Sequence, residues 1–109
     1  MATTYKFSQV QGSASTGTYV TLYNTGASTT AIVSNILIAN ESSSAVTVRL
    51  GTDTTAGTPG AGEWLLYDVV IAGNDTLSFG PLSLGNTQYL RASSSANTCT
   101  FSAAVAEIS

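Results

Sequence analysis

The chain has 109 residues, of which 43% are hydrophobic but only 8% charged, and its formal net charge is −3. Three basic side chains are too few to grip a phosphate backbone or an anionic lipid surface, which argues against nucleic acid and polybasic membrane partners. No segment approaches about eighteen consecutive apolar residues, so a membrane-spanning helix is excluded. The start of the sequence has no apolar run like that of a signal peptide, so we expect no Sec-type export.

A chain of this length fits one domain, residues 1–109, and contains no strong internal repeat and no linker. Its charged fraction is about a third of the usual one. Because a surface with few charges is weakly protected against association, this composition favours a protein that works inside an assembly. A neutral monomer is the alternative that composition leaves open.

Strand signals recur at short spacing along the whole chain. Runs rich in Val, Ile, Thr, Tyr and Phe are separated by Gly, Asn, Asp and Ser clusters, and helix signals are nearly absent. The pattern predicts an all-β fold, a jelly-roll-like antiparallel β-sandwich of about eight strands. We expect strands over residues 3–9, 17–24, 30–39, 45–51, 63–72, 76–79, 87–93 and 98–108. Pro81 should end the sixth strand and redirect the chain.

Three of these strands have one apolar face. Side chains of successive strand residues point to opposite faces, so period-two alternation assigns each residue to a face. The residues expected to face the core are Val46, Val48, Leu50, Leu90, Ala92, Phe101, Ala103 and Val105.

Two strands are apolar on both faces. In the strand at 30–39, strict alternation groups Ile32, Ile36 and Ile38 against Val33, Leu37 and Ala39. In the strand at 63–72, it groups Leu65, Tyr67, Val69 and Ile71 against Trp64, Leu66 and Val70. A two-layer sandwich covers one face of each sheet, so a loop or a neighbouring subunit must cover the other. Of the candidate covering loops, 10–16 and 52–62, the second is small and polar, and we expect it to be exposed and mobile. A homo-oligomer is therefore predicted.

The chain lacks the residue types on which common catalytic and zinc sites depend. The chain has no His and one Cys, so it can form neither a Ser/His/Asp triad nor a common zinc site. Cys99 is expected to be a small buried hydrophobe, because nothing near it in sequence would lower its pKa. We expect no catalytic residues, no metal and no cofactor.

Paired carboxylates remain formally available for glycoside hydrolysis. Of the six carboxylates, four fall in expected turns, loops or the tail. The other two lie on one expected strand, at positions whose side chains should point to opposite faces. They are Glu41, Asp53, Asp75 and Glu107, and then Glu63 and Asp68. We interpret all six as solvated surface charges.

Trp64 and five tyrosines raise the question of a sugar-binding site, because aromatic faces stack on sugars. The alternative is that Tyr67 lies in the core and that Trp64, Tyr19, Tyr23 and Tyr89 fill subunit contacts. Arg91 is either a contact anchor or a solvated strand residue. The candidate interface residues are Ile36, Leu37, Trp64, Leu66, Tyr89 and Arg91.

The order of several segments carries a family resemblance. These segments are TAIVSNILIAN at 30–40, SSSAVTVRL, LLYDVVIAGNDTLSF, PLSLGNTQYLRASSSAN and a closing TFSAAVAEI. Together they resemble the small β-sandwich virion structural proteins of tailed bacteriophages. The similarity covers residues 30–108 and leaves 1–29 unmatched.

The resemblance implies a capsid decoration (cement) protein, commonly a homotrimer, that binds the major capsid protein or other virion proteins. Its location would be the virion, which is assembled in the host cytoplasm. A tail or neck accessory protein or a host-binding adhesin is the alternative, and a cellular carbohydrate-binding module is a further one.

Overall fold

The computed structural model describes residues 2–54, 59–60 and 62–109, and these residues form nine strands and no helix. The strands are β1 (Thr3–Gln11), β2 (Val20–Asn24), β3 (Thr30–Asn40), β4 (Val46–Asp53), β5 (Trp64–Ile71), β6 (Thr76–Phe79), β7 (Leu82–Leu84), β8 (Tyr89–Ser94) and β9 (Cys99–Ile108). The expected all-β class is confirmed.

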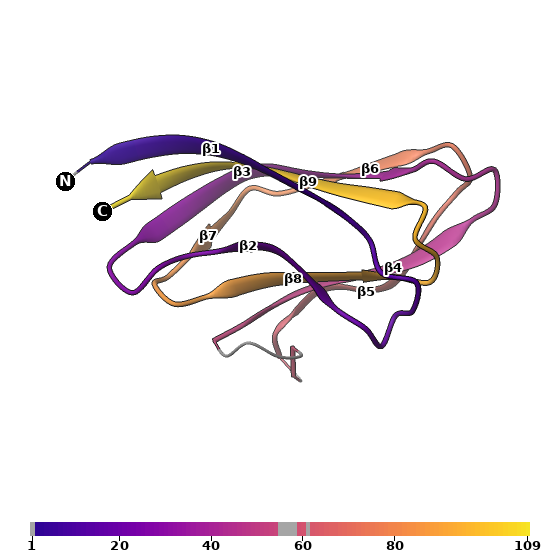
Figure 1. The fold of residues 1–109 in the computed structure, drawn as a ribbon, viewed down its shortest axis with the longest axis horizontal. Helices are drawn as coiled ribbons and strands as arrows, with labels where there is room; N and C mark the ends of the chain where they lie inside the picture. The colour runs from indigo at the N-terminus through magenta and orange to yellow at the C-terminus, as the bar shows by residue number, and fades with distance from the viewer. Residues whose placement is uncertain (1, 55–58, 61) are drawn as a thin grey trace.

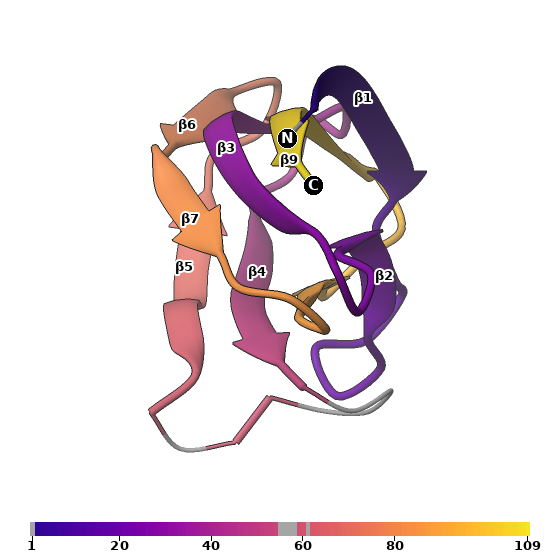
Figure 2. The same ribbon diagram turned by 90° about the vertical axis from the view of Figure 1, so that its left-hand side faces the viewer.

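Two antiparallel sheets form the layers of the sandwich (Figure 1). Sheet A has the order β1-β9-β3-β6, with β7 also paired to β3, and sheet B has the order β2-β8-β4-β5. Figure 2 shows β1 and β2, one edge strand of each sheet, on the same side of the molecule. The two ends of the chain lie together, and Ala2 and Ser109 exchange backbone hydrogen bonds of 2.8 and 3.0 Å.

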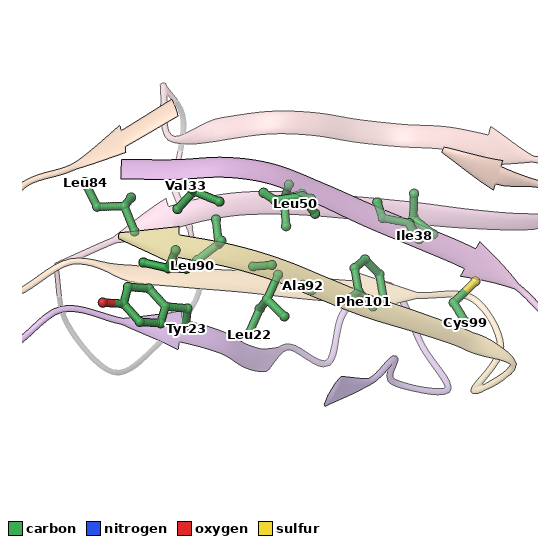
Figure 3. Close-up of a cluster of buried hydrophobic side chains, with 14 of the residues drawn as sticks. Leu22, Tyr23, Val33, Ile38, Leu50, Leu84, Leu90, Ala92, Cys99 and Phe101 are labelled. Atoms are coloured by element: carbon green, nitrogen blue, oxygen red, sulfur yellow. The ribbon is translucent and has the colours of Figure 1, made fainter. Parts of the chain in front are cut away.

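The core follows from the alternation of the one-sided strands. Leu50 of β4, Leu90 of β8 and Phe101 of β9 are fully buried between the sheets (Figure 3). Val48 of β4 is also fully buried. Each large apolar side chain buried in this way contributes roughly 1.5–3 kcal/mol. Cys99 is buried in the same cluster, as expected, and burial raises the pKa of its thiol.

Strict alternation is wrong for β3. The pairing of β3 with β9 shifts between Val33 and Asn35, so one extra residue is accommodated there. Such a β-bulge reverses the parity beyond it. Val33, Ile36 and Ile38 therefore share the buried face, whereas Ile32 and Leu37 point outward.

Alternation also fails in β5. Its pairing with β4 shifts twice, between Val48 and Leu50 and between Leu50 and Gly51. Because of these bulges, neighbouring Leu65 and Leu66 both pack against the core. The expectation that Tyr67 lies in the core is wrong, since its side chain points to solvent.

Several element boundaries differ from expectation. Strand β4 continues to Asp53, β2 begins only at Val20, and the short strand β7 follows Pro81, where the sequence analysis placed no strand. Part of the expected mobile loop, residues 55–58 and 61, lies outside the described residues. Within the described part, Pro59 is buried, and a Cβ on Gly51 would lie 2.9 Å from its ring.

Candidate functional site

The outer face of sheet A exposes four large apolar side chains. Tyr5 and Phe7 on β1 are 81% and 66% exposed, and Ile32 and Leu37 on β3 are 48% and 42% exposed. Strand β9 lies between β1 and β3, and the register aligns Tyr5 and Ile32 on either side of Ala106. We call Tyr5, Phe7, Ile32 and Leu37 the apolar face.

The strands of sheet A carry two charged residues, Lys6 and Glu107, and neither belongs to the apolar face. Their cross-strand partners are the buried residues Val105 and Ala31, so both side chains start on the inner side of the sheet. Lys6 Nζ lies 3.1 Å from Glu107 Oε1, and the Tyr23 hydroxyl donates a hydrogen bond to Glu107 Oε2. The two charges are thus paired away from the apolar face.

These contacts also shift proton affinities. The hydrogen bond from Tyr23 and then that from Lys6 lower the pKa of Glu107, because both stabilise the carboxylate. Burial, followed by the contact with Glu107, raises the pKa of Tyr23. The group borders a hollow of about 380 Å³ between β1 and β2. Since the ion pair within it is neutral overall, the hollow has no strong charge to offer a ligand.

The outer face of sheet B is built differently, around Arg49 of β4. Arg49 Nε donates to Asp68 Oδ1 at 2.7 Å, and Nη1 donates to the Tyr19 hydroxyl at 3.2 Å. These two hydrogen bonds raise the pKa of the guanidinium. The guanidinium carbon also lies 4.2 Å from the ring centroid of Tyr67, a cation–π distance.

Three aromatic rings surround this guanidinium. The ring centroids of Tyr19 and Trp64 are 5.7 Å apart, and those of Trp64 and Tyr67 are 5.1 Å apart with an edge-to-face angle of 69°. Tyr67 is 53% exposed. Beyond it on the same strand and face, Val70 is 65% exposed. We call Tyr19, Arg49, Trp64, Tyr67 and Asp68 the aromatic-arginine cluster.

Residues 12–19 run from sheet A to the outer face of sheet B. Ser94 Oγ donates to the Ser13 carbonyl at 2.7 Å, and the Thr16 carbonyl accepts hydrogen bonds from Ser93 Oγ at 3.1 Å and from Arg49 at 3.4 Å. The sequence analysis gives residues 10–16 as a candidate cover for an apolar strand face; residues 10 and 11 instead belong to β1, and Thr16 reaches the outer face of sheet B only through polar contacts. The contacts are polar, because the residues that they cover are polar.

A second arginine on this sheet is buried. Arg91 Nε lies 3.2 Å from Asp53 Oδ1, and Arg91 Nη1 donates a hydrogen bond to Thr21 Oγ1. The guanidinium carbon is 4.2 Å from the ring centroid of Tyr89. The interpretation of Asp53 as a solvated charge is wrong, as is that of Arg91 as a solvated strand residue, because both side chains are almost fully buried.

The six candidate interface residues fall into different environments. Ile36 is fully buried within its own chain and leaves no surface for a partner, and Leu66 packs against the core. Leu37 belongs to the apolar face, and Trp64 to the aromatic-arginine cluster. Arg91 is buried and makes a cation–π contact with the partly exposed ring of Tyr89. Tyr23, assigned to a subunit contact, is instead buried in the core.

The sequence analysis missed Tyr5, Phe7 and Ile32 as surface residues. A signal was present for the first two, since Tyr5 and Phe7 flank Lys6 and alternate with it on an expected strand. Two aromatic residues that alternate with a charged residue indicate an apolar outer face only when the charged side chain points inward and has a partner there. That pairing becomes visible in the contact between Lys6 and Glu107.

Across the described ranges, no three residues of the types His, Cys, Asp and Glu come together as a metal site would require. The same residues contain no helix long and apolar enough to span a membrane. Comparison of the chain with protein-family models, curated proteins and solved structures gives no match.

Proposed function

We propose that this chain is a non-enzymatic structural protein of a phage virion, a capsid decoration protein that stabilises the shell by binding the major capsid protein. The observation that carries the proposal is the apolar face, with Tyr5 and Phe7 largely exposed in a single chain. The resemblance of residues 30–108 to phage virion proteins supplies the context. The absence of His supports a binding role over a catalytic one.

Exposed apolar area of this kind is a typical contact surface. Contiguous apolar patches on soluble proteins mark interaction sites, because the hydrophobic effect favours their removal from water. The apolar face carries no charge, so docking it against another protein desolvates no ion. The capsid protein is therefore the proposed occupant of this face.

The edge strand β1 adds to the surface. It pairs with β9 along nine residues, and none of the strands in the described ranges pairs with its other edge. A long edge strand with an apolar outer side is prone to associate with another chain. We include a homotrimer in the proposal; the exposed apolar area supports association, and the number three comes from the resemblance.

The test measures capsid stability. Adding the protein to undecorated expanded capsids should raise their resistance to heat or chaotrope, because a ligand of the assembled state stabilises that state by mass action. Phe7→Glu should abolish binding, since it places a charge on the apolar face. Val70→Glu is the matched control on the opposite sheet and should bind normally. Equal capsid binding by both variants would rule out the apolar face as the contact.

A host-binding adhesin is the second candidate, and the exposed ring of Tyr67 favours it. The two functions separate in one experiment with labelled protein. Saturable binding to host cells together with no binding to capsids would replace the decoration role with the adhesin role. Light scattering on the purified protein measures its oligomeric state in the same preparation.

A further inference from the structure

The aromatic-arginine cluster has a feature that packing alone does not require. Tyr67 leaves the sheet at a bulge, and the next residue, Asp68, has a backbone φ of 53°. Non-glycine residues are uncommon in this left-handed region, although Asp adopts it more readily than most, and such residues cluster at binding and catalytic sites. Bulges likewise reorient side chains beside functional sites. Here the distortion turns an aromatic ring toward solvent.

The polar groups beside this ring are held in fixed positions. Arg49 contacts Asp68 through Nε at 2.7 Å and Nη2 at 3.4 Å, a two-point contact that orients both planar groups. The Asp68 side chain is 46% exposed, and a carboxylate has about four lone-pair sites. Asp68 therefore retains capacity to accept hydrogen bonds from a ligand beside Tyr67.

We propose that the aromatic-arginine cluster binds a neutral hexose unit of a glycan, stacked on the exposed side of Tyr67. A sugar ring presents an apolar C–H face and a rim of hydroxyls. The electron-rich face of an aromatic ring attracts C–H groups, and the carboxylate and guanidinium match hydroxyl donors and acceptors. Pockets for small ligands combine apolar area with a few placed polar groups in this way.

Other ligand classes fit the cluster less well. A cationic ligand on the exposed side of Tyr67 would lie close to the Arg49 guanidinium, which is 4.2 Å from the centre of the same ring, and would be repelled by it. An anionic ligand would need positive charge, but Asp68 neutralises Arg49, and the chain carries a net charge of −3. A neutral ligand with many hydroxyls remains.

This site is independent of the proposed contact with the capsid. The cluster lies on sheet B and the apolar face on sheet A, so a particle-bound subunit could hold a glycan on the opposite side. The two proposals can therefore succeed or fail separately, and variants on one sheet serve as controls for the other.

Trp64 provides the measurement, because it is the chain's single tryptophan and its ring centroid lies 5.1 Å from that of Tyr67. The full chain is titrated with soluble oligosaccharides of glucose, galactose, mannose and N-acetylglucosamine, and with a sialylated oligosaccharide. At least one neutral oligosaccharide should change the Trp64 fluorescence saturably. Tyr67→Ala should weaken that binding about tenfold or more, the scale of one lost aromatic contact.

Three variants separate binding from folding. Tyr67→Leu keeps apolar cover over Arg49 without the ring and should lose binding while melting like the wild type. Asp68→Asn removes a charge but tolerates the left-handed backbone, and should weaken binding. Tyr5→Ala removes an exposed tyrosine from sheet A and should bind glycan normally.

Three results would overturn the proposal. They are no saturable change with any neutral oligosaccharide, binding of the sialylated oligosaccharide alone, and glycan binding that folded Tyr67→Leu retains in full. Capsid binding measured on the same variants is read separately, because it reports on sheet A.

Discussion

The outer faces of the two sheets differ in which side chains they expose to solvent. On sheet A, the charged residues Lys6 and Glu107 turn inward and pair, leaving an apolar surface outside. On sheet B, Arg49 and Arg91 lie on the outer side with their carboxylate partners, under aromatic rings. The face that satisfies its polar groups within the chain is suited to a small polar ligand, and the apolar face is suited to a protein partner.

Covering segments reinforce this difference. Residues 16–19 and Pro59 lie over sheet B, where backbone carbonyls can accept the hydrogen bonds of Arg49 and Ser93. Phe7, Ile32 and Leu37 of the apolar face offer no such hydrogen bonds to a loop of Ser, Thr and Gly, so a polar loop gains little by covering them. Burying the apolar face would take apolar surface, which these polar connecting segments do not carry.

The largest expected effect on stability comes from comparing two adjacent residues of β3 that lie on opposite faces of sheet A. Ile36→Asp puts an unpaired carboxylate into the core and should cost about 5 kcal/mol or more, comparable with the whole stability of a small domain. Leu37→Asp should cost about 1 kcal/mol or less, because its side chain is already half-exposed. Circular dichroism and urea unfolding measure both. Unfolding of Leu37→Asp as well would show that the apolar face is not a free surface.

The next effect concerns the buried ion pair of sheet B. Arg91→Met removes the counter-charge of Asp53 and should lower the free energy of unfolding by about 3–5 kcal/mol. A second change, Asp53→Leu, in the same chain should restore part of the loss. Arg49→Met is the control at the more exposed pair and should cost far less. Equal losses for Arg91→Met and Arg49→Met would contradict the difference in burial.

Acid should remove the stability that the inward-pointing carboxylate of Glu107 contributes on sheet A. The pKa of Glu107 is lowered in the folded chain, so its contribution is present above the ordinary glutamate pKa of about 4.3 and is lost as pH falls through the lower folded value. Glu107→Gln should be less stable than wild type at neutral pH and should lose less stability below about pH 4. Urea unfolding at a series of pH values gives both curves. Parallel curves would mean that the carboxylate is not preferentially stabilised by folding.

The smallest effects on stability come from the exposed tyrosines of the two faces. Tyr5→Ser should change the free energy of unfolding by about 0.5 kcal/mol or less, because the ring is 81% exposed. Tyr67→Ser should cost about 1 kcal/mol, because its half-exposed ring also contacts Arg49 and Trp64. Their binding effects should be opposite: Tyr5→Ser impairs capsid binding and Tyr67→Ser impairs glycan binding. A variant that impairs both would show that the faces are not independent.

Period-two alternation was sufficient to assign the faces of β4, β8 and β9. Val48, Leu90 and Phe101 reach the core as the sequence predicts, and Pro81 does end one strand. These assignments depend on local properties of the chain, namely the alternation of side chains along an extended backbone and the limits that proline sets. The all-β class follows from the same local signals.

Bulges and ion pairs depend instead on which strands become neighbours. Val33 joins Ile36 in the core only because β3 shifts its register against β9, and Tyr67 turns outward only because β5 shifts against β4. Asp53 finds Arg91 across 38 positions of sequence because β4 and β8 pair. The sequence by itself thus determined most of the strands and most of the core. The tertiary structure decided which apolar and charged side chains reach the surface, because a shift of one residue in a strand exchanges its two faces.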